Sequence, residues 1–310
     1  MIGLQALQTY VPAQLVPLTE LSNLLKITEV QVNQLRDEFR LDRIAVEPDL
    51  LVHEMMHQTA VQLIEQNGIS PKDIGLILFT HSIPQFTPFL FDPFARLRKK
   101  YGLDNLQAYS IGQLNCASLD MLFLMAWQYL RQRNDGRGVL LLFGDKMFFQ
   151  TFRYLKDSTV MGDAAATAYL SPNAAGSWIL GSTVQVDATI FEGVKASPED
   201  FMWFQRTLTL GLVKTIRTTL QKCNLNISQI SLIFPSNINE KTWLKVSGLL
   251  KIPPETFYYP TMKYVGHAHN VDCLLNLEAA VDEKRLKKGD YFATLTVGMG
   301  NTFGCTIFQY

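Results

Sequence analysis

The stretch Ile111-Gly112-Gln113-Leu114-Asn115-Cys116-Ala117-Ser118-Leu119-Asp120 places a cysteine between a β-like segment, Leu106 to Ile111, and an apolar helix pattern from Leu119 to Leu130. At a helix N-terminus, the partial positive charge of the helix dipole favours a thiolate over a thiol. Backbone N–H groups at the same place can hold an oxyanion. A nucleophile is therefore one interpretation of Cys116, and a small buried core side chain is the other.

Composition describes an ordinary globular chain: 310 residues, 47% hydrophobic, 18% charged and a formal net charge of zero. This length suits one large or two medium domains. A neutral charge balance offers no basic face for nucleic acid. The segment Met1 to Pro17 has no Lys or Arg of a signal peptide, and no apolar run is long enough to span a membrane. Four cysteines without CxxC spacing also favour a reducing compartment, so we expect a cytoplasmic protein.

Two distant segments repeat the same order of features. Residues 64–79 contain a helix end, a turn and the apolar strand Ile74–Phe79, and residues 220–234 repeat this order up to Ile230–Phe234. Such continuous apolar strands are expected when a sheet is covered on both faces. A later apolar strand follows in each half, at Gly138–Phe143 and Tyr291–Val297. The pattern predicts an α/β protein built by duplication, with a site near the junction of its halves.

Two further motifs complete the pattern. Met161-Gly162-Asp163-Ala164-Ala165-Ala166-Thr167-Ala168-Tyr169-Leu170 is a Gly-Asp-rich strand, and Val297-Gly298-Met299-Gly300-Asn301-Thr302-Phe303-Gly304 is glycine-rich. Together with the cysteine, these motifs resemble the thiolase superfamily, specifically its β-ketoacyl-ACP synthase III branch, almost from end to end. The resemblance implies the thiolase fold, in which duplicated αβαβα halves form a five-layered sandwich. Residues 1–172 would carry the nucleophile, and residues 173–310 the histidine and the Gly-rich loop.

Both of the family's other catalytic positions are altered. The Pro-His-Gln-Ala-Asn motif reads Pro235-Ser236-Asn237-Ile238-Asn239, so Ser236 stands where the family has histidine. The Gly-Asn-Thr-Ser motif reads Gly266-His267-Ala268-His269, so His267 stands where the family has asparagine. A Gly-His at this second position is similar to the elongating ketosynthases, which carry two histidines.

These changes favour the loading of an acyl group over the decarboxylative condensation that follows it in the family. Loading needs only a thiolate and oxyanion donors, which the resemblance places at the backbone of Cys116 and Met299. Decarboxylative condensation also needs two donors for the enolate oxygen. A hydroxyl at Ser236 is a weaker donor than imidazole. By contrast, His267 could deprotonate an incoming hydroxyl or amine, for which an imidazole is well suited.

We therefore expect Cys116 to be the nucleophile, His267 the base and Ser236 a hydrogen-bond donor to the acceptor or to water. Asn237 is expected to hydrogen-bond to the acceptor or to water as Ser236 does, and Asn237 and Asn239 are supporting residues that could imitate the family's enolate donors. His269 and Asp272 could orient His267 or contact substrate, as carboxylates orient imidazoles in triads. The alternative for His267 and His269 is that they are loop residues held by backbone hydrogen bonds.

The resemblance also implies the reaction partners. The donor would be an acyl thioester on an acyl carrier protein or coenzyme A, with no cofactor and no metal, in a homodimer. Two basic clusters could attract such acidic donors: Lys241, Lys245 and Lys251, and Arg96, Arg98, Lys99 and Lys100. The family's tryptophan and Thr-Gly pair at the coenzyme A mouth have no counterpart around Leu35 to Ile44, which favours a carrier protein.

His53-Glu54-Met55-Met56-His57 matches the H-E-x-x-H motif of zinc hydrolases. A third ligand is missing, because Leu63 stands where a metzincin would have histidine. The thiolase resemblance makes this segment the helix before the first repeated strand, with Leu51, Met55 and Val61 facing inward.

The hypothesis is an acyltransferase that loads Cys116 and passes the acyl group to a hydroxyl or amine in specialised-metabolite biosynthesis. One alternative is a decarboxylative condensing synthase. Another is a non-catalytic partner subunit of a ketosynthase-like dimer, although the presence of Cys116 and His267 argues against it.

Overall fold

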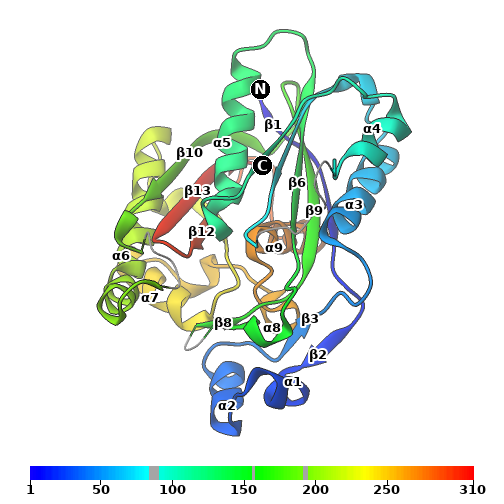
Figure 1. Cartoon of the computed structure of the whole chain (residues 1–310). Helices are drawn as coiled ribbons and strands as arrows, with labels where there is room; N and C mark the ends of the chain where they lie inside the picture. The colour runs from blue at the N-terminus through cyan, green and yellow to red at the C-terminus, as the bar shows by residue number, and fades with distance from the viewer. Residues whose placement is uncertain (84–90, 156–157, 191–194) are drawn as a thin grey trace.

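One nine-stranded sheet runs through the protein (Figure 1), in a computed structural model that describes residues 1–83, 91–155, 158–190 and 195–310. Five strands come from the first part of the chain, in the order β5 (Ala108–Ile111), β4 (Ile74–Thr80), β6 (Gly138–Asp145), β9 (Ala164–Ser171) and β1 (Gly3–Tyr10). Four come from the second part, in the order β10 (Trp178–Val186), β13 (Thr302–Gln309), β12 (Tyr291–Gly298) and β11 (Ile230–Pro235). The pairing of Gly3 with Trp178 joins β1 to β10.

The pairing pattern confirms the duplicated thiolase fold. In the order β4-β6-β9-β1, the first pair is parallel and the other two are antiparallel. The order β11-β12-β13-β10 repeats this arrangement. The predicted boundary between residues 172 and 173 falls in the connection between β9 and β10.

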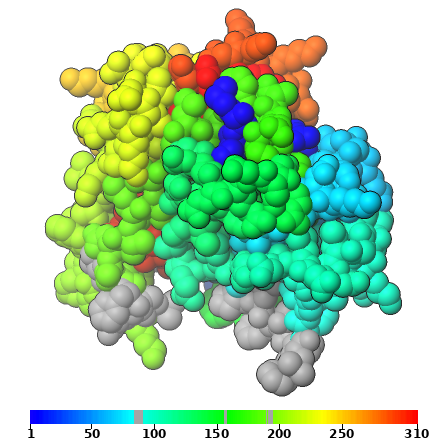
Figure 2. All heavy atoms as spheres, turned by 90° about the horizontal axis from the view of Figure 1, so that it is seen from above, coloured from blue at the N-terminus to red at the C-terminus, as the bar shows by residue number. Residues whose placement is uncertain are grey.

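Helices separate the two parts of the sheet and cover their outer faces (Figure 1). Helix α5 (Ser118–Arg131) contacts strands of both parts, and α9 (Asp272–Asp282) packs against β11, β12 and β1. On the outside, α3 (Val52–Gln66) packs on β9, β1 and β6, and α6 (Pro198–Cys223) packs on β10 and β13. The result is the expected αβαβα sandwich. Seen from above, the yellow-green to yellow surface where α6 lies beside α7 (Glu240–Leu250) is on the side opposite the cyan surface of α3 and α4 (Ala95–Tyr101) (Figure 2).

Shorter elements surround this sandwich. Strands β2 (Leu15–Pro17) and β3 (Arg43–Ala45) pair with each other, and the chain between them forms α1 (Leu18–Leu25) and α2 (Glu29–Asp37). Strand β7 (Tyr154–Leu155) pairs with β8 (Thr159–Val160), and α8 (Met262–Val265) packs against β3. Within the described ranges, no helix combines the length and apolarity that crossing a bilayer requires.

The segment predicted to face inward around the H-E-x-x-H motif is only partly buried. It forms α3, in which Met55 is fully buried and Val61 is half-buried. Leu51 is 47% exposed, so the expectation for this residue was wrong. Leu51 precedes the first turn of the helix, where its N–H donates to the Glu54 carboxylate instead of entering the core.

Helix α5 carries one carboxylate into the core between the two parts of the sheet. Asp120 is fully buried and accepts hydrogen bonds from three hydroxyls on β12 and β13, those of Thr294 (2.6 Å), Thr296 (2.6 Å) and Thr306 (2.7 Å). Burial raises the pKa of Asp120, although these bonds oppose the shift. Gly304 makes the close approach possible, since a Cβ there would lie 2.4 Å from Asp120 Oδ2.

Gly304→Ala should therefore destabilise the protein by roughly 1–3 kcal/mol or more, because the added methyl overpacks a filled polar core. Gly248→Ala is the matched control: this exposed glycine in α7 has no atom within 4 Å of a new Cβ. The control should gain about 0.5–1 kcal/mol from helix propensity. Urea unfolding followed by circular dichroism measures both. Equal stability of the two variants would contradict the packing described for Asp120.

Candidate active site

Cys116 lies where the sequence predicted it, in a 3₁₀ turn (Asn115–Ala117) that leads directly into α5. The cysteine is 8% exposed. The β12–β13 turn is bound to this segment: Asn115 Nδ2 donates to the Met299 carbonyl (2.8 Å), and the Thr302 hydroxyl donates to the Leu114 carbonyl (2.9 Å). A Cβ on Gly298 would lie 2.3 Å from that Leu114 oxygen, so only glycine permits this contact.

His267 faces Cys116 from the loop that follows α8. Its Nε2 lies 3.3 Å from Cys116 Sγ. The backbone of His267 is fixed on both sides, because its N–H donates to Val160 (2.9 Å) and its carbonyl accepts from Gly162 (3.0 Å). The loop position is therefore rigid, and it directs the imidazole at the thiol from the opposite half of the protein.

Asp272, the first residue of α9, completes a cysteine–histidine–aspartate line. Its Oδ2 lies 2.5 Å from His267 Nδ1 and also accepts the Asn237 backbone N–H (2.7 Å). Its Oδ1 accepts the Ala268 N–H (2.6 Å). A carboxylate on Nδ1 keeps the proton there and leaves Nε2 free to exchange a proton at Sγ.

The electrostatics favour charge separation within the pair formed by Cys116 and His267. Burial raises the pKa of the Cys116 thiol, but His267 and His269 outweigh it and lower that pKa to about 6. Burial likewise opposes charge on His267, but Asp272 and Cys116 raise its pKa well above the usual value. The thiolate–imidazolium form therefore predominates near neutral pH.

A second imidazole also reaches the nucleophile. His269 Nδ1 lies 3.5 Å from Cys116 Sγ, and the side chain is 2% exposed. Its Nε2 is buried and has no hydrogen-bond partner among the described residues. Cys116, His267 and His269 present ligand atoms within 4.8 Å of one another. They are the group in the described chain with metal-ligating geometry.

The three residues of the altered Pro-Ser-Asn motif have different surroundings. Ser236 is fully buried, and its hydroxyl has no hydrogen-bond partner in the described chain. Asn237 holds Asp272 through its backbone and bonds Thr261 Oγ1 (3.0 Å) through its side chain. Asn239 is the N-cap of α7, where Oδ1 accepts the Thr242 N–H at 2.8 Å. In this structure Asn237 thus positions the triad, while Asn239 begins a helix.

Sequence reasoning missed Asn270 and Asp145. Asn270 Oδ1 accepts the Leu119 N–H (3.1 Å) at the first turn of α5, and its Nδ2 donates to Ser82 Oγ (2.7 Å) and Asp145 Oδ2 (3.2 Å). Burial raises the pKa of Asp145 to about 6, against the bonds it accepts. Asn270 follows His269 directly in the chain, so its place in the motif was a usable signal. Asp145 is the last residue of a wholly buried strand, and no motif in the sequence marked it.

The two backbone groups expected to form an oxyanion hole are those of Cys116 and Met299. They belong to the two loops that Asn115 and Thr302 hold together. Their role in binding an oxyanion stays a prediction.

The zinc-hydrolase interpretation of α3 gains no support from the contacts of its residues. The His53 ring packs against Phe91 at a centroid distance of 4.9 Å. Glu54 accepts the Leu51 N–H and lies 3.6 Å from Arg96. His57 Nδ1 is buried without a partner among the described residues, and burial lowers the pKa of His57.

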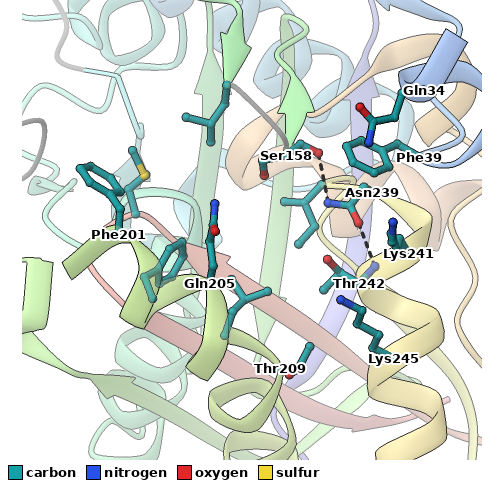
Figure 3. A pocket seen from close by; sticks show the side chains of 15 residues that line it. Gln34, Phe39, Ser158, Phe201, Gln205, Thr209, Asn239, Lys241, Thr242 and Lys245 are labelled. Atoms are coloured by element: carbon teal, nitrogen blue, oxygen red, sulfur yellow. Dashed lines mark hydrogen bonds between the residues drawn. The ribbon is translucent and has the colours of Figure 1, made fainter. Parts of the chain in front are cut away.

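A pocket of about 410 Å³ opens beside the catalytic loops, between α6 and α7 (Figure 3). Met299 lies in its wall, next to side chains such as Phe201 and Gln205 from α6 and Thr242 and Lys245 from α7. The remaining lining residues are Gln34, Phe39, Leu155, Ser158, Phe204, Leu208, Thr209, Ile238, Asn239 and Lys241. The pocket therefore combines apolar walls with two lysines.

The basic clusters noted in the sequence are partly neutralised. Lys241 pairs with Glu38 (3.0 Å). In the second cluster, Arg98 pairs with Asp92 (2.6 Å) and Lys100 with Glu65 (2.8 Å). Lys245, in contrast, projects from α7 at the pocket wall (Figure 3).

The protein has the thiolase fold, with a buried line of cysteine, histidine and aspartate between its two halves. Comparison with known proteins agrees. Residues 220–310 match the family model of the 3-oxoacyl-[acyl-carrier-protein] synthase III C-terminal domain. A β-ketoacyl-[acyl-carrier-protein] synthase III from Microcystis aeruginosa is 23% identical over 96% of this chain and 94% of its own.

Solved structures share the whole fold. ChlB3, described as an acyltransferase, superposes with a TM-score of 0.86 at 18% identity, covering 99% of this chain and 97% of its own. The 3-oxoacyl-[acyl-carrier-protein] synthase III of Aquifex aeolicus does so at 0.86 and 17% identity, covering 100% of both chains. Over its whole length the chain thus has the thiolase fold and is similar to β-ketoacyl-ACP synthase III proteins, and its C-terminal residues 220–310 match their family model.

The thiolate–imidazolium pair predicts a pH profile for alkylation of Cys116. A pKa lowered to about 6 keeps the thiolate populated at higher pH, so the iodoacetamide rate should fall as pH drops through about 6. His267→Ala removes the stabilising charge and should move the midpoint upward by about two units or more, toward that of an ordinary or buried thiol. Intact-protein mass spectrometry measures the rate, and the alkylation seen in Cys116→Ser is subtracted as the contribution of the other cysteines. An unchanged midpoint in His267→Ala would contradict the ion pair.

Proposed function

We propose that this protein is an acyltransferase that loads an acyl group from a thioester onto Cys116 and passes it to a hydroxyl or amine. The observation that carries this proposal is the line from Cys116 through His267 to Asp272. Cys116 Sγ lies 3.3 Å from His267 Nε2, and His267 Nδ1 lies 2.5 Å from Asp272 Oδ2. Such a line combines a nucleophile, a proton-exchanging imidazole and the carboxylate that orients it.

Loading begins from the ion pair. The Cys116 thiolate attacks the donor carbonyl carbon, and backbone N–H groups of Cys116 and Met299 stabilise the oxyanion in this proposal. As the intermediate collapses, the carbon–sulfur bond of the donor breaks. The departing sulfur takes the proton from His267 Nε2. Loading thus leaves an acylated cysteine beside a neutral imidazole whose Nδ1–H is held by Asp272.

Transfer reverses these roles. Neutral His267 Nε2 accepts the proton of the incoming hydroxyl or amine, whose oxygen or nitrogen attacks the thioester carbon. The bond to Sγ then breaks, and the product leaves with the acyl group. Cys116 returns as a thiolate beside protonated His267, so the starting ion pair is regenerated and all protons are accounted for.

Condensation is the second candidate. Its enolate requires two donors, and the family histidine is replaced by Ser236, whose hydroxyl has no partner in the described chain. Losing one well-placed donor costs about 3–4 kcal/mol of transition-state stabilisation. The observation in favour of condensation is His269, a second imidazole 3.5 Å from Sγ. The bond from Asp272 to His267 favours a base over a neutral donor, and therefore favours acyl transfer.

The donor in this proposal enters through the pocket between α6 and α7. Its wall includes Met299 beside the cysteine loop, and its apolar side chains suit the arm of a carrier protein or coenzyme A. Lys245 would meet the phosphate of that arm or the acidic carrier surface. ChlB3, described as an acyltransferase, and a 3-oxoacyl-[acyl-carrier-protein] synthase III share this fold equally well, so the preference for transfer rests on the site residues. The acceptor would belong to a specialised-metabolite pathway in the cytoplasm.

A homodimer fits the exposed edge of the sheet. β5 ends the strand order and carries Tyr109, which is 52% exposed. An unpaired strand edge is a template for a second copy. We propose pairing of two chains through this edge. The intact triad makes a purely supporting subunit the weaker interpretation.

Incubation with a panel of acyl and malonyl thioesters, on carrier protein and on coenzyme A, tests the loading step. Wild-type protein should gain one acyl mass that Cys116→Ala lacks, whereas the control Cys223→Ala should load normally, since Cys223 lies at the end of α6. Malonyl donors should give no carbon dioxide. Release of carbon dioxide together with a carbon–carbon product would establish condensation instead, and the absence of any adduct would overturn the proposal.

His267→Ala should separate loading from transfer. At pH 7 loading should slow, because the thiol is no longer held as a thiolate, but raising the pH above the thiol pKa should restore it. Transfer should stay slower by roughly 10²–10⁴-fold at both pH values, because the base is gone. Single-turnover adduct formation and decay, followed by mass spectrometry, give the two rates. Recovery of both rates at high pH would limit His267 to activating the thiol.

A further inference from the structure

We propose that Cys116 Sγ, His267 Nε2 and His269 Nδ1 form a reversible binding site for Zn²⁺ that blocks the nucleophile. The two nitrogens lie 3.3 and 3.5 Å from Sγ, and the three atoms lie within 4.8 Å of one another. In a tetrahedral zinc site, usual bond lengths put sulfur and nitrogen ligands about 3.6 Å apart. Both sulfur–nitrogen distances therefore suit a zinc ion bound between these atoms.

The donor set matches zinc in kind as well as in spacing. Zinc takes thiolate and imidazole ligands, and Cys116, His267 and His269 supply one sulfur and two ring nitrogens. His267 also has the partner that zinc-binding histidines use, a carboxylate on the opposite ring nitrogen, which is Asp272 Oδ2 at 2.5 Å. Coordination would release the proton on Nε2 to solvent.

His269 makes the site reversible. Its Nδ1 faces Sγ, but its Nε2 is buried without a partner among the described residues, so nothing orients this ring from behind. Lack of such a partner typically costs about 10–100-fold in metal affinity. Three protein ligands also leave the fourth position open to water, unlike the closed sites of structural zinc.

Zinc on this site and acylation of Cys116 exclude each other. Both zinc coordination and acylation form a bond to the thiolate sulfur of Cys116. His267 would likewise be unable to accept a proton while its Nε2 is bonded to the metal. Free zinc would thus hold the protein in an unloaded state until a chelator or a competing ligand removed it. The site is distinct from the His53–His57 motif on α3, which the sequence suggested for zinc.

Cobalt titration of the reduced protein, without any acyl donor, tests the site directly. Co²⁺ should bind one to one, with the visible absorption of a tetrahedral ion and a thiolate-to-cobalt charge-transfer band, and Zn²⁺ should displace it. Cys116→Ser should remove the charge-transfer band, and His269→Gln should weaken Zn²⁺ binding at least about tenfold. The controls Cys223→Ser and His57→Gln should bind as the wild type does.

A second measurement guards against misfolded variants. In wild-type protein, stoichiometric Zn²⁺ should slow iodoacetamide alkylation of Cys116 at least tenfold, and EDTA should restore the rate. Binding that survives Cys116→Ser, or that disappears in His57→Gln, would overturn the proposal, and so would the absence of any binding. Because neither readout uses a thioester, failure of the acyltransferase proposal leaves this test intact, and failure here leaves acyl loading untouched.

Discussion

The contact between the Asp272 carboxylate and His267 is the interaction on which the site depends. Asp272 begins α9, in the middle layer of the fold, and its two oxygens also hold the backbone N–H groups of Asn237 and Ala268. One buried carboxylate at the start of α9 thus holds both the His267–Ala268 loop and the distant Asn237 segment. If one partner of this buried network moved away, the remaining charged groups would be left without compensation. That cost keeps the partners in place and makes the arrangement rigid.

Rigidity matters because the chemistry requires a particular ionic state. Burial alone would keep Cys116 and His267 neutral, but the Asp272 charge raises the pKa of His267, and His267 in turn lowers that of Cys116. As proposed, the same pair would supply a nucleophile for thioesters and, with His269, a ligand set for a thiophilic metal. A site that stabilises a thiolate beside two imidazoles also presents the ligands that bind such a metal, because the thiolate is both the nucleophile and a metal ligand.

Compared with the family motifs, this chain has different polar side chains at two catalytic positions. Ser236, in the place of the family histidine, has no partner among the described residues, while Asn237 beside it supports Asp272. His267, in the place of the family asparagine, gains a carboxylate five residues later. In the proposed function, this arrangement would act as a proton-exchanging centre in place of a pair of neutral donors, and would favour attack by oxygen or nitrogen over formation of an enolate.

The sequence by itself determined the duplicated α/β fold, because continuous apolar strands and a helix following Cys116 repeat with the same order in both halves. It also identified Cys116, His267, His269 and Asp272 as candidates, since each falls in a recognisable motif. Only the tertiary structure brought them together in one site. The sulfur and the imidazoles are about 150 residues apart and meet because α5 and α9 share the middle layer. Hydrogen-bond direction, burial and the placement of Asp145 and Asn270 follow from that packing, which local residue patterns do not encode.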